Sequence, residues 1–168
     1  MIPGRSWRPG GVRNCLGVTL VELVVTLVII GILAAVVMPR LIDRDIFEAR
    51  GFYDQTMSML RYAQKTAVAQ RRNVCVAFTS TSLSLTIAAQ AGSAEACTEN
   101  LRGPDGNAPY AITAPGNITY TTTAGAVTTP AGFTFSALGQ AVLGANQVFR
   151  VSGFSRDITI ERETGYVH

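Results

Sequence analysis

An apolar run of helical length stands near the start of this chain of 168 residues. Between Val18 and Met38 the one ionisable side chain is Glu22, and about 20 apolar residues suffice to cross a bilayer as a helix. A carboxylate within such a run is costly unless something neutralises it, so an intramembrane Glu indicates a function and requires a partner. We therefore predict a transmembrane helical half over residues 18–39.

Beyond Pro39 the chain becomes polar, but apolar residues still recur at steps of three and four. This pattern predicts an amphipathic helical half over residues 40–71 that ends near Gln70 and lays its apolar stripe on a sheet. Counted from Val18, the helix would be roughly 80 Å long at about 1.5 Å per residue. Its apolar positions are Ile42, Ile46, Ala49, Phe52 or Tyr53, Leu60, Ala63 and Ala67.

Alternation with a period of two follows, and it predicts strands over 74–79 and 83–88 with a turn at Thr79 to Ser82. Further short strands are expected over 118–122, 133–136, 147–151 and 158–162, with a turn and a last strand over 164–167. Residues 91–115, rich in Gly, Pro, Asn and small residues, are expected to form a surface loop. The predicted fold class is α+β, with the long N-terminal helix packed on an antiparallel β-domain over 72–168.

The formal charge of +3 comes from the first residues of the chain. Without Arg5, Arg8 and Arg13 the chain carries 11 basic and 11 acidic side chains, so its composition does not indicate a nucleic-acid surface. Basic residues before a spanning helix stay cytoplasmic, which places everything after Pro39 outside. An ordinary secretory leader is the alternative, but residues 36–40 offer no convincing small-residue cleavage site.

The spacing between Gly17 and Glu22 suggests the missing partner. If the chain is cut after Gly17, the new α-amino group of Val18 lies four residues from Glu22, one helical turn away in the same chain or beside it in a neighbour. A carboxylate that merely snorkels to the cytoplasmic interface is the alternative for Glu22.

The segment 17–22, GVTLVE, resembles the class III signal of type IV prepilins and secretion pseudopilins, in which a dedicated peptidase cuts after the Gly. This resemblance implies a cleaved leader over residues 1–17, with cleavage between Gly17 and Val18. It also implies that the helix bends at Gly31 and Pro39, which stand where the family carries a helix Gly and a kinking Pro. The family mostly has Phe or Met at the position of Val18, so N-methylation of the new terminus stays open.

The predicted layout is a helix followed by an antiparallel domain, and the two are joined by the stretch LRYAQKTAVAQRRNV at residues 60–74. This layout is similar to the family of the H pseudopilin of type II secretion and the T fimbrial minor pilin (GspH/FimT). The stretch is also similar to minor pilins of the mannose-sensitive haemagglutinin (MSHA) type, which are members of the same family. It implies a minor pilin-type subunit of the bacterial inner membrane, with its domain in the periplasm, that enters a type IV pilus-like filament or its tip. The implied partners are other pilins, the prepilin peptidase and an inner-membrane assembly platform. An H-type pseudopilin, which uses the same anchor, is the alternative.

Two of the three cysteines, Cys75 and Cys97, lie beyond the leader that holds Cys15. An even pair in an extracytoplasmic domain predicts a disulfide. A metal pair or a catalytic thiol is the alternative, but a metal needs more ligands and the one histidine is His168. We therefore expect no metal site and no cofactor.

The sequence contains no plausible Ser-His-Asp or Cys-His catalytic constellation, so we do not expect an enzyme. T-type relatives can bind DNA through a C-terminal Gly-Arg-x-Arg motif, of which Gly153 to Arg156 matches only the second Arg. A DNA-uptake subunit is thus a further alternative, and Arg150, Arg156 and Arg162 would be its contact residues. The pair Arg71 and Arg72 is expected to be a solvated helix end.

Overall fold

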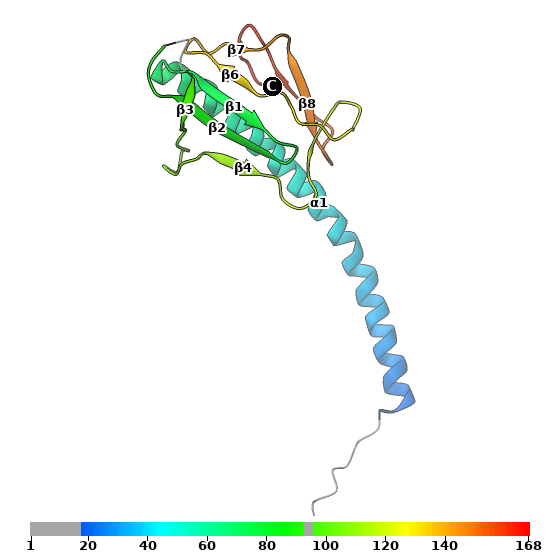
Figure 1. Cartoon of the computed structure of the whole chain (residues 1–168). Coiled ribbons are helices and arrows are strands. Elements are labelled where there is room, and N and C mark those ends of the chain that lie inside the picture. The colour runs from blue at the N-terminus through cyan, green and yellow to red at the C-terminus, as the bar shows by residue number, and fades with distance from the viewer. Residues whose placement is uncertain (1–17, 93–95) are drawn as a thin grey trace, which may run out of the picture. The chain divides into compact units, whose positions relative to one another are not determined.

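The computed structural model of the chain describes residues 18–92 and 96–168, without the side chains of 35–43 (Figure 1). It divides into two compact units, Met1–Leu41 and Ile42–His168. Each unit is described by itself. The predicted leader over 1–17 lies outside the described residues.

One helix, α1 (Leu20–Gln70), has residues in both units. It begins two residues after the predicted start at Val18 and ends at the predicted residue Gln70. In the part of the chain that the structure describes, no helix is long and apolar enough to cross a membrane.

The part of α1 in the second unit is amphipathic, as its periodicity predicted. Its inward face buries Phe52, Leu60 and Ala63, which recur at helical spacing, while Arg61 and Lys65 on the other face are exposed. Burying the larger side chains stabilises the domain by roughly 1.5–3 kcal/mol each. The remaining buried apolar residues of this face are Ala49, Tyr53, Met57, Met59 and Ala67.

The helix ends in a Schellman arrangement. Arg72 N donates to Ala67 O at 3.1 Å and Arg71 N donates to Val68 O at 3.3 Å, which satisfies two of the last helical carbonyls. Arg71 takes the left-handed position with φ of 53°. That position usually holds Gly, because a side chain there costs about 1 kcal/mol.

The larger sheet has six strands in the order β3-β2-β1-β6-β7, with β4 paired to β2 beside β3. Figure 1 shows β1 and β2 lying across the C-terminal part of α1. All pairings are antiparallel, as predicted. The strands are β1 (Val74–Phe78), β2 (Ser82–Ala88), β3 (Cys97–Asn100), β4 (Ala111–Thr113), β6 (Phe133–Phe135) and β7 (Ala141–Val142).

Strand register places alternate apolar residues of three strands on one buried face. Val76 lies opposite Leu85 on one side and Phe133 on the other, and Val74 lies opposite Ile87 and Phe135. A slip of one residue would turn this whole set towards solvent, so the alternation fixes the register.

A second, three-stranded sheet completes the domain in the order β5-β8-β9. Its strands are β5 (Tyr120–Thr121), β8 (Gln147–Val151) and β9 (Asp157–Ile160). Beyond β9 the chain turns back, and the backbones of Thr159 and His168 exchange two hydrogen bonds of 2.8 and 3.1 Å. The turn expected over 164–167 is thus present in part, but in place of the expected last strand there is a single isolated bridge between Ile160 and Val167.

Residues of α1 and of both sheets share one hydrophobic core. Tyr120 lies at its centre, with ring centroids 5.2 Å from Phe52, 5.5 Å from Phe78 and 5.4 Å from Phe149. Its hydroxyl lies 3.0 Å from Oγ1 of Thr56, so the one polar atom of this ring has a partner. Burial raises the pKa of Tyr120 well above its usual range.

The prediction of a loop over 91–115 is wrong in part. This segment contributes β3 and β4 to the edge of the larger sheet, and Leu101 is buried. Both strands are three or four residues long, which is too short for an alternation to be visible in the sequence.

Candidate functional site

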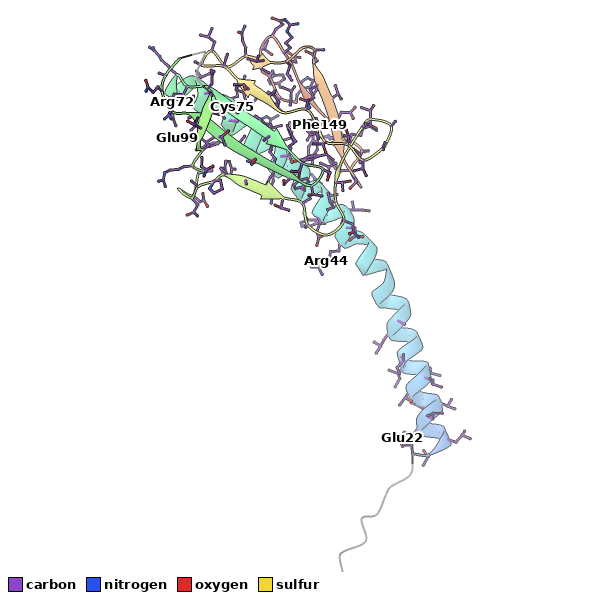
Figure 2. The ribbon with its side chains drawn as sticks, viewed as in Figure 1. Glu22, Arg44, Arg72, Cys75, Glu99 and Phe149 are labelled. Carbon is purple, nitrogen blue, oxygen red and sulfur yellow. A yellow bond between two sulfur atoms is a disulfide. The ribbon has the colours of Figure 1, made fainter. Side chains whose placement is uncertain are left out.

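Glu22 lies in the first turn of α1, on a turn that Thr19 caps (Figure 2). The backbone N–H of Glu22 donates to Oγ1 of Thr19 at 3.2 Å, and Leu23 N donates to Thr19 O at 3.1 Å. Thr19 is therefore the N-cap and Glu22 the third helical residue, the spacing of a capping box. A carboxylate at this position is also favoured by the positive end of the helix dipole.

The sequence analysis did not identify Thr19 as a cap, although the pattern Thr-x-x-Glu before an apolar run signals one. Glu22 itself is exposed. Its carboxylate makes no hydrogen bond or ion pair within residues 18–92 and 96–168, so a partner in the same chain is not seen among them.

Apolar side chains around Glu22 are also uncovered in the described chain. Val18 and Leu20 are 70% and 79% exposed, and a Cβ placed on Gly31 would meet nothing within 4 Å. The remaining exposed apolar residues up to position 33 are Val21, Leu23, Val24, Val25, Leu27, Val28, Ile29, Ile30, Ile32 and Leu33. An uncovered stripe of this length requires lipid or protein around it in the cell.

The other predicted residues of this region are only partly visible. Gly17 lies outside the described residues, and so does the side chain of Pro39. Cleavage between Gly17 and Val18 and a helix bend at Gly31 and Pro39 therefore stay predictions.

Cys75 and Cys97 form a disulfide with a Cα–Cα distance of 6.0 Å. Cys75 lies on β1 and Cys97 on β3. The bond therefore links a central strand to the edge of the sheet across β2.

Arg72 braces the same edge, as Figure 2 shows beside Cys75 and Glu99. Its Nε donates to Ala88 O at 2.5 Å and its Nη2 contacts Oε2 of Glu99 at 2.7 Å. The expectation of a solvated helix end is therefore wrong for Arg72, whose guanidinium joins the helix end to β2 and β3. Arg71 is exposed.

The three arginines considered for DNA contacts have different surroundings. Arg150 pairs with Asp157 and donates to Thr123 O at 3.0 Å, and the hydrogen bond to Asp157 raises the pKa of Arg150. Arg162 donates to Gly144 O at 3.3 Å and lies 3.4 Å from Glu163. Only Arg156 has no hydrogen bond or ion pair among the described residues, and it lines a shallow cavity with Arg61 and His168.

Sequence reasoning also missed the polar contacts that hold the end of the chain. Arg61 donates to Val167 O from Nε at 3.2 Å and from Nη2 at 3.1 Å. Both contacts span more than 100 residues of sequence, so no local pattern signals them.

Within the described ranges, no group of three or more His, Cys, Asp or Glu could hold a metal ion.

Comparison with known proteins gives one family match. Residues 12–38 match the family model of the prokaryotic N-terminal methylation motif, which confirms the resemblance of this region to type IV pilin-like proteins. No curated protein matches the sequence.

Two crystal structures of the type IV minor pilin FimU from Pseudomonas aeruginosa strain PAO1 are similar to this structure, each at 18% sequence identity. One has a TM-score of 0.49 and covers 72% of this chain and 87% of FimU. The other has a TM-score of 0.44 and covers 68% and 86%. At these TM-scores the likeness carries no argument about function.

Proposed function

We propose that this chain, which carries the prokaryotic N-terminal methylation motif over residues 12–38, is a minor pilin-type structural subunit. It is made as a bitopic precursor in the bacterial inner membrane, with the leader cytoplasmic and the β-domain periplasmic. Prepilin peptidase cuts it after Gly17, and the assembly platform then moves it into a type IV pilus-like filament or to the filament's tip.

One observation carries this proposal, namely a single acidic residue in an otherwise apolar helix start, inside the matched motif. Glu22 lies four residues from the amine that cleavage would create at Val18. When helices pack and exclude water, an unpaired carboxylate is costly, and an ion pair with an amine offsets that cost. The acid thus favours association of processed subunits over dispersed ones.

The β-domain supports the role of a packing module rather than a catalyst. The buried hydroxyls of Tyr120 and of Thr56 on α1 lie 3.0 Å apart, so each has a partner inside the fold. Its loops and the outer face of α1 remain for neighbouring subunits. In this reading the domain determines which neighbour the subunit accepts.

Mass spectrometry of sheared filaments tests the proposal. We expect the chain among the filament proteins, beginning at Val18, together with other pilins. Its absence from sheared material in cells that make filaments would refute a pilus role. Cosedimentation with a type II secretion machine instead would favour the H-type pseudopilin, which the motif fits equally well.

DNA uptake is a weaker candidate function. One exposed cation, Arg156, supports it, whereas Arg150 and Arg162 already have partners. Several phosphates must be neutralised together for useful DNA affinity. A gel shift at a stated salt concentration, with wild type beside Arg156→Ala, tests it.

A further inference from the structure

The charges along α1 are segregated within the second unit. From Asp43 to Asp54 the helix carries four acidic and two basic residues, whereas from Gln55 to its end at Gln70 it carries two basic residues and no acidic one, and Arg71 and Arg72 follow directly. The helix part of this unit thus has an acidic beginning and a basic end, although the unit as a whole is balanced.

The basic end includes a groove on the solvent face of α1. Two shallow cavities of about 340 and 370 Å³ share Ser58 and Arg61 in their linings, so they adjoin on this face. We call this surface the basic groove, and its main residues are Ser58, Arg61, Tyr62, Lys65, Tyr110 and Arg156.

The groove has free positive charge and a rigid aromatic wall. Lys65 is exposed and makes no hydrogen bond or ion pair within the described residues. Tyr62 meets Tyr110 edge to face at 5.3 Å and donates its hydroxyl to Arg102 O at 2.9 Å. The one acidic residue in the lining is Asp54. Such a surface fits acidic side chains of a partner, with tyrosine as an ordered contact.

The acidic beginning of the helix supplies a matching surface, the acidic turn Asp45–Glu48. Asp45 and Glu48 line a cavity of about 300 Å³ together with Ser152 and Gly153. Arg44 pairs with Glu48 at 3.0 Å and leaves Asp45 without a partner among the described side chains. The cavity has room for the end of a lysine or arginine side chain.

Helix geometry places these two surfaces on opposite sides of α1. Asp45 precedes Arg61 by 16 residues and Lys65 by 20, so at about 100° per residue it lies roughly 160° away from each, in opposite senses. Along the axis the separation is about 24–30 Å. The two surfaces therefore lie on opposite faces of α1 and are offset along its axis. Two parallel copies that are shifted along the helix can then meet with the acidic turn of one against the basic groove of the other.

We propose that the basic groove of one subunit receives the acidic turn of a second copy of this chain, parallel to it and shifted along α1. This inference rests on the proposed filament role. The contact is heterologous, because a different patch is used on each partner, so it leaves one groove and one turn open and propagates as an open helix rather than closing as a dimer. Nucleic acid is a poorer occupant, because the groove includes Asp54 and offers only three cations.

Charge reversal in two differently tagged full-length copies tests the contact. The copies are co-expressed and solubilised in mild detergent, one tag is captured, and the other is quantified. We expect Lys65→Glu in both copies, or Asp45→Lys in both, to lower the capture about fivefold by placing like charges together. Pairing a Lys65→Glu copy with an Asp45→Lys copy should restore capture, because each contact is then again between opposite charges.

Glu163→Lys is the matched control, since it changes the charge by the same amount at a side chain 78% exposed and outside both surfaces. It should leave capture at the wild-type level, and all variants should retain the Cys75–Cys97 disulfide as a check of folding. Unchanged capture in Lys65→Glu, or no restoration in the mixed pair, overturns the proposal. Reduced binding of labelled DNA by Lys65→Glu with unchanged capture also overturns it and assigns the groove to a polyanion.

The proposed filament role can be refuted independently of the proposed contact between copies. If wild type is absent from sheared filaments, the proposed function is wrong whatever the capture shows. If wild type is present there and the charge variants enter equally well, only the contact between copies is wrong.

Discussion

Gly165 approaches Gly139 so closely that a Cβ on Gly165 would lie 2.0 Å from the carbonyl oxygen of Gly139. The amide of Gln64 joins the two turns, because its Nε2 donates to Gly139 O at 3.0 Å and to Thr164 O at 2.9 Å. Gly165 also has a φ of +65°, which side chains rarely adopt. The C-terminal turn, the turn between β6 and β7 and the helix α1 are thus packed together at a single point.

Gly165→Ala should therefore lower the free energy of unfolding of the full chain by about 3 kcal/mol or more, through the clash and the strained φ together. Denaturant unfolding in detergent measures it. Gly125→Ala is the control, because Gly125 has a φ of +88° but open space around it, so only the conformational cost of about 1 kcal/mol applies. Equal losses in the two variants would show that the close approach to Gly139 does not matter.

Arg71→Gly should raise the free energy of unfolding by about 1 kcal/mol, because Gly adopts the left-handed end of the Schellman motif without strain. Arg71→Asn tests the same point, since Asn tolerates this conformation and also removes the charge. Arg71→Ala removes the charge and keeps the strain, so it should give no gain. A gain in Arg71→Ala equal to that in Arg71→Gly would assign the effect to charge instead.

Removing the disulfide by Cys75→Ser with Cys97→Ser should lower the free energy of unfolding by about 3 kcal/mol, given the separation of 22 residues. The edge strand β3 should lose the most local stability. The disulfide and the Arg72–Glu99 ion pair both hold this strand in place, and the double variant keeps only the ion pair. Hydrogen exchange of the β3 amides measures this local effect. In unreduced wild-type protein, alkylation of both thiols would contradict the presence of the bond in the cell.

The long periodic elements could be predicted from the sequence, and so could short strands such as β5 and β6, but other short strands could not. The end of α1 at Gln70 follows from a stripe that includes Phe52, Leu60 and Ala63, and β1 and β2 follow from strict alternation. In contrast β3, β4 and β7 have two to four residues. Their existence depends on pairing with distant strands rather than on a local pattern.

The residues of the candidate site also differ in whether the sequence alone could identify them. Glu22 was identified because a carboxylate in an apolar run conflicts with its surroundings. The roles of Arg61 and Gln64 depend on residues about 75 to 106 positions away, so only the folded chain reveals them. Thr19 is an intermediate case, because a local cap signal was present.

Gly17→Asp should leave a full-length precursor in the membrane, because the side chain blocks the small position before the proposed cut. Intact mass of the membrane-bound protein measures it, with wild type expected to begin at Val18. Gly11→Asp, which adds the same charge elsewhere in the leader, should be processed normally. A wild-type mass that retains Met1 in cells with active prepilin peptidase would refute cleavage.

Glu22 has two separable properties, a place in the capping box of α1 and a negative charge, and substitutions can separate them. Glu22→Gln preserves the capping-box side chain but removes the charge. Glu22→Leu removes both, and Glu22→Asp keeps the charge on a shorter side chain. If the carboxylate pairs with the amine of Val18 in a neighbouring subunit, Gln and Leu should both insert and be cleaved yet enter filaments poorly, while Asp should be intermediate.

The ratio of subunit in the sheared fraction to subunit in the membrane measures these outcomes, with cleavage followed by mass in the same samples. A capping-box role of the side chain alone predicts that Gln behaves like wild type and Leu does not, because Leu has no polar group that could reach back to the backbone N–H of Thr19. Snorkelling alone predicts that all three variants enter as well as wild type, because no assembly step uses the charge. A loss shared by Gln and Leu is assigned to the missing charge, because both variants keep the backbone N–H of residue 22 that donates to Oγ1 of Thr19.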